Sequence, residues 1–487
     1  MLQPGPRLLF ALNEPGYFRL YGSTIVEMAR RGWDVALVFD KPNRRGVDAQ
    51  LPAGAGGSVR SLGALPDAVS PAMATLRLGL DYLRYLEPSF AEATYLRSRA
   101  EKHLPRALGF LARVKRLPRW VVSVAIALGR AVERVVPVSR AMLAFVREAR
   151  PDVIVVSPVV IIGDGGVRQT ELMKAGRALR IPVVVGVASW DHLTSKGLLR
   201  LVPDAVTVWN ETQADEAVRL HRIPRSRVVV TGAQSLDHWF EAASPDAVPA
   251  FRRNLGIDDH RRVVLLVGSS ANMAPGDSEP QFARRWLRAL RASANAELSG
   301  AFVIVRPHPG NTEPWQQVDL GDPGAAVHPM TYSGMPLGDP EIETFRQSLL
   351  ASDAVVGINT TAMIEAAILR KPVFSIRDVA FEHSQQQTLH FGYLSDDREG
   401  FVATANSMPE HVVELERLFT HGPNLEAADR FVGRFVRPLG MGQPATGQLC
   451  DVIERMIPMV PRREVSNPAS TAEESRWTPS HVRTGRQ

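Results

Sequence analysis

Residues 352–376 read SDAVVGINTTAMIEAAILRKPVFSI, and this stretch sets the fold class of the chain. The apolar run AVVG suits one short buried strand, and Asn359, Thr360 and Thr361 after it are residues that favour the start of a helix. AMIEAAIL is almost wholly apolar, which predicts a buried helix, and Lys371–Pro372 ends it before a second strand, VFSI. A strand, a helix and a strand in succession predict a parallel βαβ unit.

The same alternation of strands and helices runs through most of the chain. Ten short continuous apolar runs, typical of strands buried on both faces, recur on either side of a stretch without a strand. We therefore predict an α/β fold of two Rossmann-like, doubly wound domains that face a cleft. The predicted segments are an N-terminal domain (1–240), a linker (241–262), a C-terminal domain (263–425), helices that dock back on the body (426–460) and a disordered tail (461–487).

The composition narrows the class of protein. The chain has 487 residues and one cysteine, Cys450, so the sequence predicts neither a disulfide framework nor a cysteine-based zinc site. The apolar run LLFAL near the N-terminus is too short for a signal peptide. The longest apolar run lies in WVVSVAIALG, residues 120–129, and is shorter than the ~20 residues that cross a bilayer. We expect a cytoplasmic protein.

The positive charge is concentrated in one segment. Residues 77–150 carry 15 Lys or Arg against 6 Asp or Glu, although the whole chain has a net charge of only +6. They lie in a helical insertion, about 70–150, that breaks the βαβ rhythm. Two interpretations stay open: a solvated helical insertion, or peripheral contact with an anionic membrane surface on the inner face. No nucleic-acid-binding motif occurs, so we expect no nucleic acid partner.

Residues 302–310, FVIVRPHPG, run a buried strand straight into Arg306 and into His308, which stands between two prolines. Side chains at the carboxyl end of a parallel strand face the crevice where α/β proteins bind ligands. Arg306 offers a planar fork of donors suited to phosphate, and His308 adds another donor. The start of the helix after Thr361 would bring N–H groups and hydroxyls to the same edge. Glu365, a lone carboxylate on that helix, suits a ribose diol, or else bonds nearby backbone or an arginine.

Together these motifs resemble the C-terminal half of GT-B glycosyltransferases, nearest the branch of CDP-glycerol glycerophosphotransferases and capsule polysaccharide transferases. The resemblance implies that the histidine and the Ser/Thr turn contact the donor's phosphates and that the helix glutamate binds its ribose. We expect further donor contacts from the first loop of the C-terminal domain and from FEHSQQQTLHF, residues 381–391, where three glutamines leave the register open and a plain polar loop is the alternative. The donor-binding candidates are Arg306, His308, Asn359, Thr360, Thr361, Glu365, Gln385, Gln386, Ser269 and Ser270.

In the N-terminal half, PVVVGVASWDHLTSKGLL (182–199) ends a strand next to Asp191 and His192. A transferase needs a general base to deprotonate its acceptor hydroxyl, and either residue can serve, with the other orienting it. The stretch partly resembles the W-H-G…K-x-x-G pattern of the glycerophosphotransferases, with an Asp inserted and the Gly lost. On the loop after the first strand, Asn13 and Arg19 are the acceptor-side candidates, with Arg19 meeting an acceptor phosphate or else capping the helix that follows.

The sequence therefore predicts a transferase of the GT-B glycosyltransferase type. It would move a sugar from a nucleotide-activated donor to a hydroxyl of a glycan or lipid-linked acceptor, in cell-surface polysaccharide or envelope glycan synthesis. We expect neither a metal nor a cofactor other than the donor, since no D-x-D triplet occurs. The resemblance implies a single displacement with inversion. Three alternatives remain: a CDP-alcohol phosphotransferase, a sugar-nucleotide 2-epimerase, and a non-catalytic nucleotide- or membrane-binding scaffold.

Overall fold

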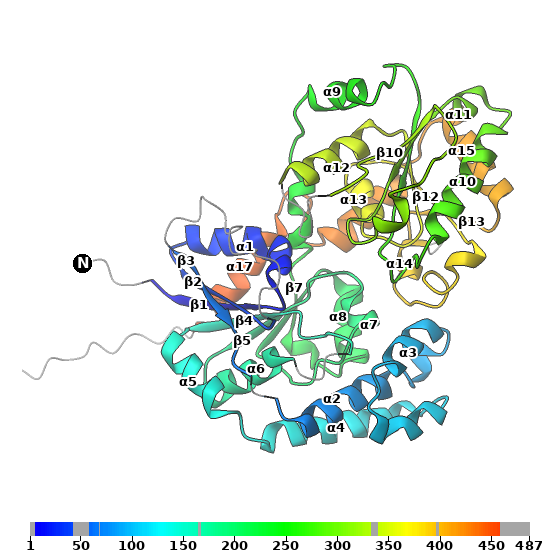
Figure 1. Ribbon diagram of the computed structural model, residues 1–487. Helices are drawn as coiled ribbons and strands as arrows, with labels where there is room; N and C mark the ends of the chain where they lie inside the picture. Colours follow the sequence, from blue (N-terminus) through cyan, green and yellow to red (C-terminus); the bar gives the residue numbers. More distant parts are fainter. Residues whose placement is uncertain are drawn as a thin grey trace, which may run out of the picture.

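The computed structural model describes residues 5–41, 58–67, 69–163, 167–332, 339–395 and 399–457. Figure 1 shows two α/β domains, each built on one sheet, joined by chain segments that pass between them. The predicted tail, 461–487, lies outside the described residues. The predicted fold class of two doubly wound parallel-sheet domains is confirmed.

The N-terminal domain is built on a seven-stranded parallel sheet in the order β3-β2-β1-β4-β5-β6-β7. The strands are β1 (Arg7–Leu12), β2 (Asp34–Phe39), β3 (Val59–Ala64), β4 (Val153–Ser157), β5 (Val183–Gly186), β6 (Ala205–Val208) and β7 (Val228–Val230). The helices that connect them include α1 (Phe18–Arg30), α6 (Arg168–Ala178), α7 (His192–Ser195) and α8 (Glu211–Arg219). The strand order reverses between β1 and β4, and α/β folds bind ligands beyond the carboxyl ends of strands at such a point.

The C-terminal domain repeats this plan with six parallel strands in the order β10-β9-β8-β11-β12-β13. The strands are β8 (Val263–Val267), β9 (Phe302–Arg306), β10 (Ala325–Val327), β11 (Ala354–Gly357), β12 (Val373–Ile376) and β13 (Ala403–Ala405). The helices are α10 (Ser278–Arg291), α11 (Ala296–Ser299), α12 (Asp339–Ala351), α13 (Ala362–Ile368), α14 (Phe391–Ser395) and α15 (Met408–His421). The order reverses between β8 and β11, so this sheet also offers a crevice at its carboxyl edge.

The three strands that the sequence did not predict all lie at sheet edges. β3 reads VRSLGA and is largely exposed, while β10 (AAV) and β13 (ATA) are three residues long. Continuous apolar runs mark strands that are buried on both faces, and an edge strand needs no such run. The sequence pattern therefore identified the central strands and the edge strand β7, and it missed the other three edge strands.

The insertion between β3 and β4 is bound tightly to the N-terminal domain through buried arginines. Its helices are α2 (Pro71–Arg84), η3 (Pro88–Phe90), α3 (Thr94–Glu101), η4 (Arg106–Arg113), α4 (Arg119–Val135) and α5 (Arg140–Ala149). Arg77 donates from Nη2 to Glu171 of α6 at 2.5 Å, and Arg130 donates to the carbonyl of Leu199 at 2.8 Å. Buried charge needs such partners. The expectation that the arginines of this segment lie on a surface is therefore wrong for Arg77, Arg84 and Arg130, which are buried.

The chain crosses between the domains twice. After β7 it passes through η6 (Gln234–Phe240) to α9 (Ala247–Asn254), which packs on α12. It returns through α16 (Glu426–Phe431) and the π-helix η9 (Val432–Val436) to α17 (Ala445–Arg455), which packs on α1. Asp237 ties the two crossings together, because its carboxylate accepts from Arg437 at 2.9 Å and from the amide of Thr446 at 2.7 Å.

Candidate functional site

A cavity of about 1100 Å³ lies between the two domains. This volume is slightly above the roughly 300–1,000 Å³ of small-molecule sites. The loops that follow β1 and β5 in one domain, and β8, β9 and β11 in the other, form its walls. Polar side chains that line it include Glu14, Tyr17, Arg19, Asp191, His192, Lys196, Arg306, His308, Thr360, Thr361 and Glu365. The cavity thus brings together eight sequence-predicted residues from both domains, at the edge where ligands are expected.

Arg306 ends β9, beside Val267 of β8, and its side chain lines the cavity although it is only 4% exposed. Nη2 donates to the carbonyl of Glu341 at 3.2 Å, whereas Nη1 has no hydrogen-bond partner. Among the described residues no carboxylate forms an ion pair with Arg306, and burial lowers its pKa although the charges of Tyr332 and Glu365 oppose this fall. The guanidinium lies 4.8 Å from the ring centroid of Phe345. A buried cation without a counter-ion is costly, so this position favours an anionic ligand.

His308 is positioned by a close approach of two loops. The amide of Gly268 donates to the carbonyl of Arg306 at 2.8 Å, and a Cβ at Gly268 would lie 2.7 Å from the amide nitrogen of His308. Only glycine fits there. The ring Nδ1 of His308 accepts from the amide of Gly310 at 3.0 Å, which leaves Nε2 as the ring's donor. Burial lowers the pKa of His308 to about 4, so the free ring is neutral at pH 7.

The turn between β11 and α13 completes this wall. Thr360 and Thr361 line the cavity, and the hydroxyl of Thr361 accepts from Trp190 Nε1 of the other domain at 3.1 Å. Helix α13 has only seven residues, and we assign no separate anion site to its amino end. Glu365 faces the cavity from the first turn of α13. Burial raises the pKa of Glu365 to about 7, although the charges of Arg19 and Arg306 oppose this rise.

On the opposite wall, Asp191 is held by hydroxyls. Its carboxylate accepts from Ser189 at 2.8 Å and from Ser195 at 2.7 Å, with Lys196 Nζ at 3.9 Å. Burial alone would raise the pKa of Asp191, but the charges of Lys196 and His192 outweigh burial and hold it well below its usual range. Burial lowers the pKa of His192 to about 4 against the attraction of Asp191. The imidazole is therefore neutral at pH 7, and its Nδ1 has no hydrogen-bond partner.

Side chains of the insertion hold the backbone of the turn that carries Asp191 and His192. Arg84 donates to the carbonyl of Leu193 at 2.7 Å, and the hydroxyl of Tyr85 donates to the carbonyl of Lys196 at 2.6 Å. Asp81 accepts from the amide of Leu198 at 2.8 Å. These groups on α2 and just after it fix the backbone around His192. The sequence carried no signal for this contact, because nothing local links two segments more than 100 residues apart.

Six predicted residues do not line the cavity: Asn13, Ser269, Ser270, Asn359, Gln385 and Gln386. The amide of Ser269 donates to Glu279 at 2.7 Å, and the side chain of Asn359 donates to the carbonyl of Ser384. Gln385 is buried and donates to the carbonyls of Ile358 and Ile376 at 3.2 and 3.1 Å. Side chains that satisfy buried backbone groups look like ligand contacts in a sequence. We therefore revise the assignment of Asn359 and Gln385 as donor contacts, whereas Asn13, Ser269, Ser270 and Gln386 stay predictions.

Some cavity residues were not predicted from the sequence. Lys196 stands inside the quoted motif W-D-H-L-T-S-K-G, whose lysine was the signal that could have identified it. Trp239, Tyr332 and Phe345 line the cavity with aromatic rings and come from segments without any recognisable motif. Among the described residues, no group of three or more His, Cys, Asp or Glu is placed to hold a metal ion.

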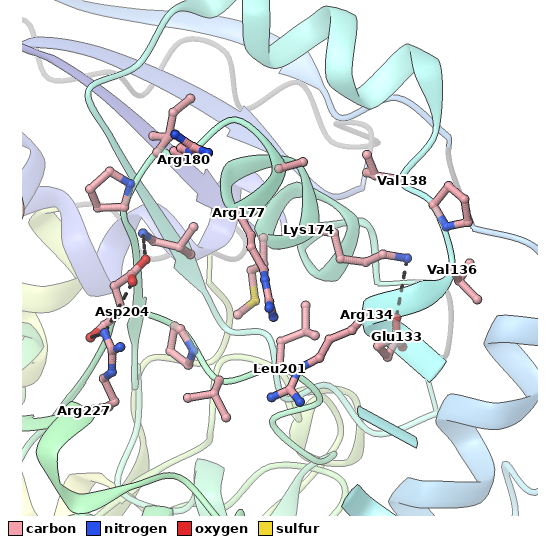
Figure 2. A pocket seen from close by; sticks show the side chains of 18 residues that line it. Glu133, Arg134, Val136, Val138, Lys174, Arg177, Arg180, Leu201, Asp204 and Arg227 are labelled. Atoms are coloured by element: carbon pink, nitrogen blue, oxygen red, sulfur yellow. Dashed lines mark hydrogen bonds and ion pairs between the residues drawn. The ribbon is translucent and has the colours of Figure 1, made fainter. Parts of the chain in front are cut away.

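A second cavity, of about 720 Å³, lies in the N-terminal domain (Figure 2). It is bordered by the end of α4, by α6 and by the segments that precede β5 and β6. It contains none of the predicted site residues and lies at the amino ends of these strands. The interdomain cavity is therefore the candidate active site.

No family model matches the chain, and no curated protein is significantly similar to it in sequence. Among solved structures, the chain is similar to the S. aureus MnaA–UDP co-structure, with 10% identity, 93% of this chain and 98% of that chain covered, and a TM-score of 0.50. It is also similar to a glycosyltransferase from Rickettsia africae ESF-5 (9% identity, 93% and 100% covered, TM-score 0.48). A third is the UDP-GlcNAc 2-epimerase from Neisseria meningitidis bound to UDP-GlcNAc, with 12% identity, 92% of this chain and 99% of that chain covered, and a TM-score of 0.49. The likeness to the first of these structures shows the fold alone, an arrangement of two Rossmann-like domains.

Proposed function

We propose that the chain is a glycosyltransferase that binds a nucleotide-sugar donor on the C-terminal wall of the cleft and transfers the sugar to a hydroxyl of an acceptor on the N-terminal wall. Arg306 carries this proposal. Its guanidinium is almost fully buried, lines the interdomain cavity, and has no carboxylate partner among the described residues. A diphosphate supplies the missing anion and matches the planar fork of donors.

On the donor side, Arg306, the Nε2 of His308 and the hydroxyl of Thr360 hold the diphosphate. Arg19 faces them from the N-terminal domain, is exposed, and has no ion pair within the described parts of the chain. The positive charge on both walls stabilises the nucleoside diphosphate as it leaves with its electron pair. Glu365, on the same wall, accepts from the ribose hydroxyls when it is ionised.

On the acceptor side, His192 is the proposed general base. Its imidazole is neutral at pH 7 and the residue lines the cavity, so it can accept the proton of the acceptor hydroxyl. Asp191 is a poor base, because hydroxyls occupy its oxygens and its pKa is low. It is a positioning residue that also stabilises the imidazolium. The acceptor oxygen bonds to the anomeric carbon as the bond from that carbon to the diphosphate breaks, which inverts the configuration.

We place this reaction in envelope or capsule polysaccharide synthesis in the cytoplasm. The R-x-H-P and Ser/Thr-turn resemblance to capsule transferases supports the first part, and the use of a single cysteine supports the second. The acceptor would then be a growing glycan or a lipid-linked sugar. The charge that a metal ion would supply in other transferases is assigned here to Arg306 and Arg19.

The test is calorimetric titration of the full chain with UDP, GDP, CDP, dTDP and CMP, followed by product analysis with the sugar nucleotide of whichever base binds. A glycosyltransferase releases the nucleoside diphosphate when an envelope extract supplies acceptors. A phosphotransferase acting on CDP-glycerol releases CMP, and an epimerase converts UDP-GlcNAc at C2 without releasing nucleotide. Binding without turnover indicates a scaffold, and no binding at millimolar nucleotide overturns the proposed site.

A further inference from the structure

Helix α4 is apolar on both of its sides. On the inner side Val122, Ile126 and Gly129 are buried, and a Cβ at Gly129 would clash with Leu80 of α2. On the outer side, five large apolar residues are exposed and repeat at intervals of three or four, which places them on one face. These residues, the α4 face, are Trp120 (69% exposed), Val124 (51%), Leu128 (63%), Val132 (38%) and Val135 (76%).

The α4 face is uncovered by any described part of the chain. Figure 1 shows α4 along the lower rim of the N-terminal domain, where it packs on α2. Scattered exposed apolar residues are common on proteins, but a row of five along one helix marks an interaction site. No helix in the described ranges is both long and apolar enough to cross a bilayer.

The surroundings of the α4 face are positively charged. Residues 102–147 contain ten Lys or Arg and one acidic residue, Glu133. Glu133 is buried and pairs with Arg77, so it does not offset the exposed cations. Cations on both sides of α4 are exposed and form no ion pair within the described ranges: Arg106, Arg113, Lys115, Arg116, Arg134 and Arg140. This charge favours an anionic partner.

The cavity of Figure 2 begins where α4 ends and adds to this charge. Arg134, Arg177 and Arg180 line it, and none of them pairs with a carboxylate among the described residues. The same cavity has apolar walls, from Met173 and Leu201 among others. Exposed guanidinium groups beside apolar walls suit the phosphate of an amphiphilic molecule better than a free inorganic ion.

We infer that the α4 face and its flanking cations dock the protein on an anionic lipid surface. The apolar side chains enter the boundary between headgroups and acyl chains, and the arginines meet lipid phosphates. A symmetric dimer through this face would set two basic rims against each other, which disfavours a second copy of the chain as the occupant. The inference does not depend on the proposed function, because it concerns a surface outside the cleft.

The test is flotation of the full chain with vesicles of phosphatidylcholine alone, or mixed with an equal amount of phosphatidylglycerol. We expect binding to the anionic vesicles only, weakening as salt rises. Trp120→Glu/Leu128→Glu lowers the partition coefficient about tenfold or more, because charge replaces apolar side chains at the interface. The matched control is Val379→Glu/Val413→Glu, which changes two exposed apolar residues of the C-terminal domain and leaves binding unchanged.

A second variant separates charge from apolar contact. Arg116→Glu/Arg134→Glu reverses two cations at the two ends of α4 and should weaken binding to anionic vesicles while reducing its salt dependence. Unchanged melting temperatures show that the variants remain folded. The inference is overturned if the wild type ignores anionic vesicles at low salt, or if Trp120→Glu/Leu128→Glu binds them as well as the wild type. A wild-type dimer that this variant converts to a monomer, without vesicle binding, would identify a subunit interface instead.

Discussion

The donor-side wall of the cleft and the Asp191–His192 turn of the opposite wall differ in whether their charged groups have partners. On the C-terminal wall, Arg306 is buried without an ion pair among the described residues, and the ring of His308 keeps a free donor. On the N-terminal wall, Asp191 has its oxygens occupied by Ser189 and Ser195. The first wall therefore lacks an anion that a ligand must bring, whereas the Asp191–His192 turn of the second wall is complete without one. This difference teaches that changes to the C-terminal wall should alter affinity, whereas changes to the Asp191–His192 turn should alter rate.

The largest expected effect comes from His192→Gln. Loss of a general base lowers kcat by about 10²–10⁴-fold. The nucleotide Kd should stay unchanged, since the residue lies on the opposite wall. In the wild type, the pKa of His192 is lowered to about 4. We therefore expect kcat/KM for the acceptor, measured with saturating donor, to stay level from neutral pH down to about pH 5 and to fall only below it. A fall of this kcat/KM near pH 6.5, or an altered nucleotide Kd in the variant, would contradict the role of His192 as a base that does not contact the donor.

Asp191→Asn keeps the shape of the turn and removes the charge that stabilises the imidazolium. Because Asp191 raises the pKa of His192, the acidic limb of kcat/KM should move to still lower pH, and kcat should fall less than in His192→Gln. If Asp191 were the base, the asparagine variant would be the more damaged of the two. Rate measurements on both variants across the pH range decide between them.

The next effect is on affinity. Arg306→Ala removes charged hydrogen bonds worth about 1.5–3 kcal/mol, so nucleoside diphosphates should bind roughly 10- to 150-fold more weakly by calorimetry. Arg306→Lys should recover part of the loss, because it restores the charge without the planar fork. The matched control is Arg417→Ala, which removes an exposed arginine paired with Glu414 at 2.5 Å. Equal affinity in Arg306→Ala and the control would contradict the assigned phosphate site.

Strand ends explain how much of the site the sequence could predict. The tips of parallel strands meet at one sheet edge, so Arg306, His308 and Thr361 could be grouped from the sequence alone. The fold class followed from the same buried strands. Gln385 misled for a physical reason, since a buried amide that satisfies backbone carbonyls looks the same in sequence as one that binds a sugar.

The insertion shows what the sequence could not predict. Arg84 counted toward a basic surface in the sequence, yet the folded chain uses it to hold the carbonyl of Leu193 beneath the His192 turn. Burial of an arginine depends on carbonyls distant in the chain, and helical periodicity cannot reveal them. The apolar run at 120–129 was visible in sequence, but only the packing of α2 against its inner face distinguishes the covered side from the exposed one.

On the donor wall, Glu365 should make the affinity for the nucleotide sugar depend on pH. Burial raises the pKa of Glu365 to about 7, so its ionised form, which accepts from ribose hydroxyls, increases as pH rises through neutrality. A nucleotide sugar, whose diphosphate does not titrate in this range, should bind more tightly at pH 8 than at pH 6, by up to about tenfold. Glu365→Gln should bind weakly with no pH dependence. A 2′-deoxyribose analogue binding the wild type as tightly as the ribonucleotide would exclude the ribose contact.

The smallest expected effect tests whether donor binding depends on a hydrogen bond between the two walls. Trp190 donates to the hydroxyl of Thr361 at 3.1 Å, a hydrogen bond between the two domains. Trp190→Phe keeps an aromatic ring next to His390, and Thr361→Ala removes the acceptor. Each should raise the donor KM about two- to tenfold, as expected for one hydrogen bond of about 0.5–1.5 kcal/mol. In the double variant the effects should not add, since both single changes remove the same bond. Additive effects would mean that the two side chains influence the donor KM independently and not through this hydrogen bond.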